Sequence, residues 1–168
     1  MGLEKRPYID LFIIKEIKIK KRINTDEMVA RIGSWKDNNL QIRCAREAIR
    51  LINYYIENHI SFNQETTLSG KSIIRNIKKA RQEGFYVVMN YIGVDNCDIA
   101  KERVKIRVMK GGHGISERDI ERRYYESLNN LKKILGICNE INIYDNTNEF
   151  KYVAYICNGT VKWQRNTI

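Results

Sequence analysis

Three polar stretches of this sequence contain the residue types that handle a phosphorylated or hydroxyl-rich ligand. The first, Asn24-Thr25-Asp26-Glu27, follows an apolar segment and opens a helical pattern. A carboxylate at the carboxyl end of a strand can accept a proton from a substrate hydroxyl, or hold a magnesium ion through water. The alternative is that Thr25 or Asp26 only caps the helix. The residues of this stretch leave both interpretations open.

The second stretch follows Phe62 and crowds four side chains that bond polar ligands. They are Glu65, Thr66, Thr67 and Ser69. This set suits recognition of a hydroxyl-rich substrate. A strand-to-helix turn capped by Ser69 would use the same residues, so the two interpretations are about equally favoured.

Gly70-Lys71-Ser72 repeats the last three residues of a phosphate-binding loop. That loop also needs a glycine five positions before the first of these residues. Position 65 is Glu65, so the motif fails. We therefore assign Gly70-Lys71-Ser72 to the turn after the strand and look elsewhere for a phosphate loop.

The third stretch consists of two basic helical segments joined by the glycine-rich residues 111–114. Its cationic residues are Arg103, Arg107, Lys110, Arg118, Arg122 and Arg123. Guanidinium groups neutralise the charge that develops in phosphoryl transfer, and a glycine turn would let the two helices close as a lid. The alternative is ordinary exposed charge on two helices.

The elements that must position these stretches alternate along the chain. Apolar periodicity and capping residues predict helices over 40–60, 70–83, 95–110 and 116–135, with Asp95 and Ser116 as N-caps. Apolar runs predict strands over 61–66, 85–94 and 141–144, then a hairpin of 151–157 and 161–163. This alternation favours an α/β domain with a mainly parallel sheet covered on both sides. Ligands bind such sheets at the carboxyl ends of the strands.

Length, hydropathy and net charge further limit the class of protein and its possible partners. With 168 residues we expect one domain, and without a run long enough to span a bilayer we expect a soluble, cytoplasmic protein with no membrane partner. The net charge of +10 invites a nucleic-acid interpretation. Stacking aromatic residues and base-reading motifs are not evident, so we expect nucleic acid not to be the partner.

The series INTDEM, FNQETTLSG, RVMKGGHGI, DIERRYYESLNNL and YDNT, in this order, resembles the zeta-toxin-like family of small P-loop ATPases and kinases. The resemblance covers about residues 23–147. It implies a three-layer α/β/α P-loop NTPase-like fold. It also implies a phosphotransferase, in a bacterial toxin-like or metabolic setting, that uses ATP or GTP with magnesium on a small hydroxyl-bearing substrate such as a UDP-sugar. An antitoxin protein is a further partner that the resemblance allows.

The resemblance also implies roles for particular residues. Asp26 is similar to the family's catalytic carboxylate. The residues similar to its lid arginines are Arg107, Arg122 and Arg123. Those similar to its substrate-binding strand end are Glu65, Thr66 and Thr67. Those similar to a loop near the nucleotide base are Asp145, Asn146 and Thr147. No protein ligand to a metal is expected.

One part of the family pattern is missing. Family members begin with a strand and a glycine-rich loop that ends in Gly-Lys-Ser/Thr, whereas this chain begins MGLEKRPYIDLFIIKEIKIKKR. Codons for this start, read in a displaced frame, can spell glycine, threonine, glycine, lysine, threonine, threonine, leucine, tyrosine. We therefore interpret residues 1–22 as a basic, non-family segment produced by a frameshift, and residues 23–168 as the family domain.

Two expectations follow from the missing loop. The chain should bind ATP or GTP weakly or not at all, because the loop supplies the amides and the lysine that hold the phosphates. The loss of the first strand should also expose a sheet edge and lower stability. The alternative function is then a catalytically inactive remnant or binding module.

Overall fold

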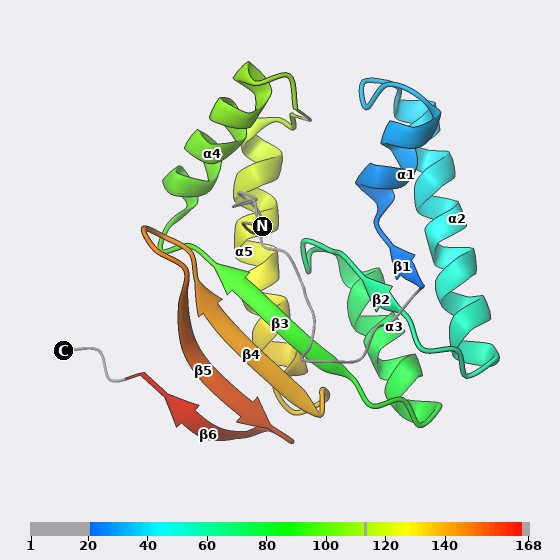
Figure 1. Ribbon diagram of the computed structural model, residues 1–168, viewed down its shortest axis with the longest axis vertical. Coiled ribbons are helices and arrows are strands. Elements are labelled where there is room, and N and C mark those ends of the chain that lie inside the picture. The colour runs from blue at the N-terminus through cyan, green and yellow to red at the C-terminus, as the bar shows by residue number, and fades with distance from the viewer. Residues whose placement is uncertain (1–20, 113, 166–168) are drawn as a thin grey trace.

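The computed structural model describes residues 21–112 and 114–165, so residues 1–20 of the expected non-family segment lie outside it. The elements follow one another in the order β1 (Arg22–Ile23), α1 (Thr25–Ile32), α2 (Asn38–Glu57), β2 (Asn63–Gln64), α3 (Lys71–Gln82), β3 (Val88–Gly93), α4 (Cys97–Met109), α5 (Glu117–Ile134), β4 (Glu140–Asp145), β5 (Lys151–Cys157) and β6 (Thr160–Gln164). Figure 1 shows this arrangement.

The predicted helices and strands are present, and most boundaries agree within a few residues. Ser116 caps α5, as predicted, and accepts a hydrogen bond from the Asp119 amide at 3.1 Å. Two predicted caps are wrong. Asn96, not Asp95, caps α4, and α3 begins after Gly70 without any side-chain cap from Ser69. Adjacent polar residues compete for a cap, and the chain path decides between them.

The strands form two sheets. β1 pairs with β2 in parallel, and the larger sheet has the order β3-β4-β5-β6. Only the β3–β4 pairing of the larger sheet is parallel, because the predicted hairpin adds two antiparallel pairings. The class is therefore α/β with a mixed larger sheet, rather than a mainly parallel one.

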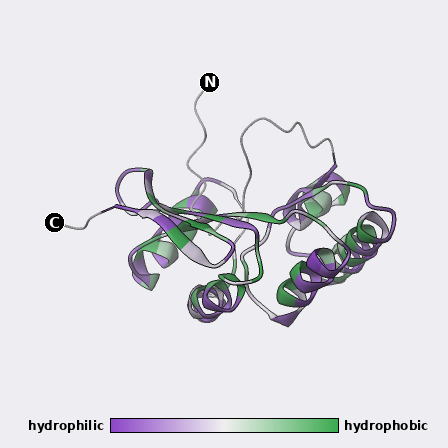
Figure 2. Cartoon of the chain, turned by 90° about the horizontal axis from the view of Figure 1, so that it is seen from below, coloured by the Kyte–Doolittle hydropathy of each residue, from purple (hydrophilic) through white to green (hydrophobic). Residues whose placement is uncertain are grey.

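Helix α3 joins the two sheets through its apolar face. Ile73 and Ile77 pack in a core with Met89 and Tyr91 of β3, whereas Ala80 packs in a second core with Ile23 of β1. The first core also contains residues of α5, and Figure 1 shows α3 and α5 behind the sheet strands. In Figure 2 the helices carry both hydrophilic and hydrophobic residues, as expected of helices that bury one face.

The other face of the larger sheet carries aromatic rings from β4 to β6. Tyr144 stacks on Phe150 and contacts Tyr152, which stacks on Trp163, each with ring centroids 5.0 Å apart. Phe150, Tyr152 and Trp163 are at least one third exposed. Aromatic pairs across strands stabilise a hairpin, so this row explains how the exposed strand β6 stays on the sheet.

Two further properties bear on the class of protein. None of the described helices combines the length and apolar character needed to cross a membrane. Cys44, Cys97, Cys138 and Cys157 carry free thiols. Burial raises the pKa of the Cys138 thiol to about 12, which keeps this side chain neutral in the core.

Candidate functional site

The carboxyl ends of β1 and β2 bring two polar side chains together. Arg22 and Ile23 pair with Asn63 and Gln64, so the chain places Asn24 beside Glu65 one residue later. The Asn24 side-chain amide and the Arg22 guanidinium both donate to the Glu65 carboxylate. The Glu65 side chain is 12% exposed. These two donors fix the orientation of the carboxylate.

Asp26 lies in the first turn of α1, and its side chain is exposed. Asn24 caps this helix by accepting a hydrogen bond from the Glu27 amide at 3.1 Å. The interpretation of Thr25 or Asp26 as the cap is therefore wrong. The Asp26 carboxylate faces solvent one turn from the Asn24–Glu65 contact, and the helix N-terminus favours its negative charge.

The turn of residues 65–70 holds its own hydroxyl groups in hydrogen bonds. Thr66 Oγ1 accepts from the Leu68 amide at 3.1 Å, and the hydroxyls of Thr67 and Ser69 lie 2.7 Å apart. Leu68 has φ 53° and is fully buried. A non-glycine residue in the left-handed region costs about 1–2 kcal/mol, so contacts elsewhere must hold this turn in place.

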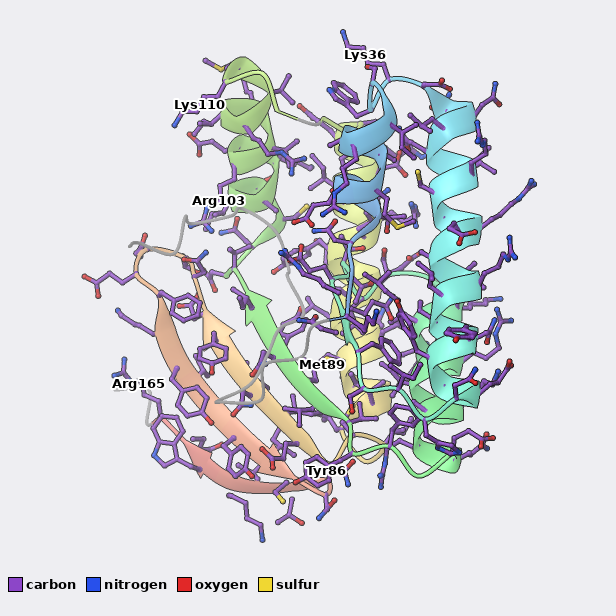
Figure 3. All side chains as sticks on the ribbon, turned by 45° about the vertical axis from the view of Figure 1, so that its right-hand side comes forward. Lys36, Tyr86, Met89, Arg103, Lys110 and Arg165 are labelled. Atoms are coloured by element: carbon purple, nitrogen blue, oxygen red, sulfur yellow. The ribbon has the colours of Figure 1, made fainter. Side chains whose placement is uncertain are left out.

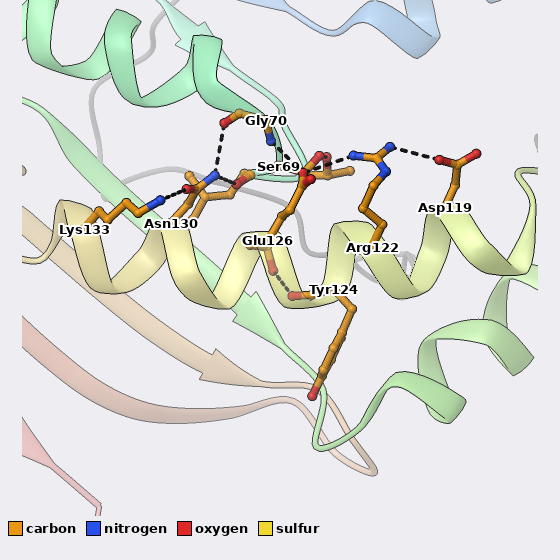
Figure 4. A network of polar contacts seen from close by, with 11 residues as sticks. Ser69, Gly70, Asp119, Arg122, Tyr124, Glu126, Asn130 and Lys133 are labelled. Atoms are coloured by element: carbon orange, nitrogen blue, oxygen red, sulfur yellow. Dashed lines mark hydrogen bonds and ion pairs between the residues drawn. The ribbon is translucent and has the colours of Figure 1, made fainter.

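Those contacts come from α5 (Figure 4). The Asn130 side-chain amide donates to the carbonyl oxygens of Leu68 at 2.9 Å and Gly70 at 3.1 Å. Glu126 Oε2 accepts from the Gly70 amide at 3.0 Å. Asn130 is buried, with 6% exposure. The helix therefore fixes the C-terminal half of the strained turn, and this explains the position of Asn130 in the SLNNL motif.

Arg122 continues this network along α5. It donates to Glu126 at 3.1 Å and to Asp119 at 2.9 Å. The hydrogen bond from Arg122, with a second one from Ser116, lowers the pKa of Asp119. The hydrogen bond to Asp119 correspondingly raises the pKa of Arg122. The charge of this predicted lid arginine is therefore balanced by two carboxylates of its own helix.

Gly70-Lys71-Ser72 sits at the N-terminus of α3, the place where a phosphate loop would bind an anion. The Glu126 carboxylate already accepts the Gly70 amide there. A second negative group would be repelled from this position. The described residues around this turn do not fit a nucleoside triphosphate, which agrees with the assignment of Gly70-Lys71-Ser72 to the turn.

Arg107, the predicted lid arginine on α4, is half-buried near the start of the glycine turn. A Cβ atom at Gly112 would lie 2.6 Å from Arg107 Cγ, so the turn needs glycine to pass this side chain. A Cβ atom at Gly114 would lie 3.6 Å from the Trp35 ring. The turn therefore reaches the loop between α1 and α2.

This contact places the predicted lid and the helix of Asp26 at one end of the molecule. Figure 1 shows α1 and α4 on either side of α5, and Figure 3 shows Lys36 and Lys110 at that same end. Arg123 lies on α5 and is half-buried. The described contacts bring Asn24, Glu65 and α5 together, but they do not join Asp26 to Arg122 or Arg123.

Asp145, Asn146 and Thr147 form a loop that is closed by its own contacts. Asp145 Oδ1 accepts from the Thr147 amide at 2.8 Å and from its hydroxyl at 2.5 Å. Thr147 Oγ1 accepts from the Asp95 amide at 2.9 Å. Arg103 donates to the carbonyl oxygens of Asn146 and Thr147 at 2.5 and 2.6 Å. The predicted base-binding residues thus use their polar groups to hold the loop.

Several residues that organise the site were not singled out from the sequence. They are Arg22, Glu126 and Asn130, whereas Asn24 and Arg103 were named only as members of a polar stretch and a basic stretch. Each contacts a residue more than 40 positions away in the chain. Of these residues, Asn130 could have been identified from the sequence, because it belongs to the motif that carries the family resemblance.

Comparison with known proteins gives one informative match. The chain is 41% identical over 102 residues to an uncharacterized protein of Haemophilus influenzae, a region that covers 61% of this chain and 73% of that protein. No family model matches the chain, and no solved structure matches it.

Proposed function

The chain belongs to the same family as the uncharacterized Haemophilus influenzae protein. From the resemblance of its sequence motifs, we propose that it is a phosphotransferase domain of the zeta-toxin-like class. The proposed activity is phosphorylation of a small hydroxyl-bearing substrate, such as a UDP-sugar, at the expense of ATP or GTP with magnesium. The proposed fold is the three-layer P-loop NTPase-like one, of which the α/β class and the parallel strand pairs are observed.

The contact of Asn24 and Arg22 with Glu65 carries this proposal. It joins two of the three predicted polar stretches at the carboxyl ends of parallel strands, where ligands of such sheets bind. A turn strained at Leu68 follows directly, and backbone strain of this kind concentrates at ligand-binding sites.

Within this site the side chains have distinct roles. Asp26 is exposed, and its carboxylate is the group proposed to accept the proton of a substrate hydroxyl. Glu65 is proposed to accept hydrogen bonds from substrate hydroxyls, since each carboxylate oxygen has two acceptor positions. The hydroxyls of Thr66 and Thr67 line the same turn. Together they favour a ligand rich in hydroxyl groups.

A binding module without turnover is the second candidate, and one observation favours it. Glu126 accepts a hydrogen bond from the amide of Gly70, the first residue of the only Gly-Lys-Ser sequence in the chain. The Gly70 amide is therefore not available to the phosphates of a nucleotide. The two candidates differ in one measurable respect, the consumption of ATP.

Calorimetric titration with UDP-N-acetylglucosamine tests the acceptor site. We expect binding by the full chain, and a loss of at least about tenfold in affinity in Glu65→Gln, equivalent to about 1.4 kcal/mol. Asp98→Asn is the matched control, because Asp98 is an exposed acid in the first turn of another helix, α4. Absence of binding by the unmodified chain would refute the acceptor site.

An ATPase assay with the same substrate separates the two candidates. Phosphorylated product that disappears in Asp26→Asn, but not in Asp98→Asn, supports the transferase. Substrate binding without ATP consumption supports the binding module instead.

A further inference from the structure

Helix α3 has a basic outer face that the proposed phosphotransferase site does not use. Its apolar face is buried through Ile73, Ile77 and Ala80. On its outer side lies an open hollow of about 560 Å³, which is lined entirely by residues of this helix: Lys71, Ile74, Arg75, Lys78, Lys79 and Gln82. Four of these six side chains are cationic and none is acidic.

The charge of this face is largely uncompensated. Lys79 donates to Glu57 of α2 at 2.9 Å and to Asn53 at 3.0 Å. Lys71, Arg75 and Lys78 make no ion pair with any residue of the described part of the chain. Arg122 of α5, by contrast, is paired with two carboxylates. The α3 face therefore offers an external anion three cations that no carboxylate of the described residues neutralises.

The spacing of the three unpaired cations fits a row of anions rather than a single one. A rise of about 1.5 Å per residue separates Lys71 from Arg75 by roughly 6 Å along the helix, and Arg75 from Lys78 by roughly 4.5 Å. Long side chains widen these separations further. A single phosphate could engage one or two of them, whereas a polyanion engages all three.

We propose that the outer face of α3 binds the phosphate backbone of double-stranded nucleic acid without reading its sequence. A duplex carries about one negative charge per 1.7 Å of its axis, which is the polyanion that this row and the net charge of +10 complement. Single strands are bound by stacking bases on aromatic side chains. No aromatic residue lines this hollow, which favours the duplex.

This proposal departs from the expectation, drawn from the sequence, that nucleic acid is not a partner. That expectation rested on the absence of base-reading motifs. Contacts with phosphates position a protein on a duplex and need no such motif. The relevant signal is the distribution of charge in the fold, because the cations of α3 are separated along the sequence by apolar residues that turn inward.

Fluorescence anisotropy with a labelled DNA duplex of about 20 base pairs tests the proposal on the full chain. Three phosphate contacts give a slope of about −2.7 in a plot of log K against log salt, so affinity should fall about 40-fold between about 50 and 200 mM salt. In the variant Lys71→Gln/Arg75→Gln/Lys78→Gln this slope should be close to zero.

The matched control is Arg43→Gln/Arg46→Gln/Arg50→Gln, which removes the same charge from the exposed face of α2. The control should keep most of the slope. Equal losses in both triple variants would mean that general charge, not the α3 face, binds the duplex, and this would overturn the proposal. Circular dichroism verifies that both variants are folded, since all six side chains are exposed.

Two further arms exclude other polyanions. A single-stranded oligonucleotide of the same length should bind more weakly than the duplex. Vesicles of anionic phospholipid should bind the unmodified chain no more tightly than they bind the α3 triple variant. If the single strand or the vesicles bind the chain more tightly than the duplex does, and the α3 triple variant loses this binding, the duplex assignment is overturned. Absence of duplex binding at about 50 mM salt would also overturn it.

Discussion

The turns that follow β2 and β4 are both polar and both lie at the carboxyl end of a strand, yet they are held differently. The turn of residues 65–70 is held from outside by Glu126 and Asn130 of α5. The loop of residues 145–147 is held from inside, because Asp145 accepts from the amide and the hydroxyl of Thr147. Arg103 then binds only its backbone carbonyls.

This difference favours the first turn as the proposed ligand-binding one. In the loop of residues 145–147 the side chains of Asp145 and Thr147 are used to keep the loop closed. In the turn of residues 65–70, α5 holds the backbone at Leu68 and Gly70, so the turn does not depend only on the hydrogen bonds of its own hydroxyl groups. We therefore regard the first turn as the binding element and the second as a structural connection, although its role near a nucleotide base stays a prediction.

Replacing Leu68 should cause the largest loss of stability. Leu68→Ala removes a fully buried side chain and leaves the backbone strain in place. We expect a loss of about 2–5 kcal/mol in the free energy of unfolding, measured by urea denaturation. Ile32→Ala, at a residue that is 67% exposed, is the control and should change stability by about 0.5 kcal/mol or less. A small effect of Leu68→Ala would mean that the turn is not packed as described.

Replacing Asn130 should have the next largest effect. Asn130→Ala leaves the carbonyl oxygens of Leu68 and Gly70 without their donor. A buried polar group left unsatisfied costs about 1–3 kcal/mol. The neighbouring variant Asn129→Ala is the control, since Asn129 is exposed on the same helix. Equal effects of the two substitutions in urea denaturation would contradict the role assigned to α5.

The loop of residues 145–147 should be less sensitive. Arg103→Lys keeps the charge but loses the fork that reaches two carbonyl oxygens. We expect a loss of about 1–2 kcal/mol in unfolding free energy, and no change in affinity for UDP-N-acetylglucosamine. Arg118→Lys, at an exposed position of α5, serves as the control. Weaker ligand binding by Arg103→Lys would remove the distinction between the two turns.

The helices and most strands could be predicted because their signals are local. Apolar residues at helical spacing identified α2 and α3, and the apolar run of residues 85–94 identified β3. The exact caps could not be predicted at α3 and α4, because Ser69 with Gly70, and Asp95 with Asn96, offer two candidates in adjacent positions. The chain path chooses between them.

The organisation of the site depended on pairing across long distances. The contact of Asn24 with Glu65 requires the parallel register of β1 and β2, and each of these strands has only two residues. The mixed larger sheet has a similar cause. The hairpin of β5 and β6 was visible in the sequence, but its place beside β4 was not, because nothing local specifies which strand a hairpin joins.

The aromatic row of the larger sheet shows the same limit. Tyr144, Phe150, Tyr152 and Trp163 are ordinary aromatic residues in the sequence. They become one row only when β4, β5 and β6 pair, with an irregularity of register after Ile143. Tertiary pairing, not local preference, decides which side chains share a face.

Nuclear magnetic resonance of the labelled chain, titrated with UDP-N-acetylglucosamine, tests the central claim most directly. The account predicts that backbone amide shifts concentrate in residues 24–27 and 65–70, and that residues 145–147 stay unchanged. Shifts confined to residues 145–147, or spread evenly over the described chain, would contradict it.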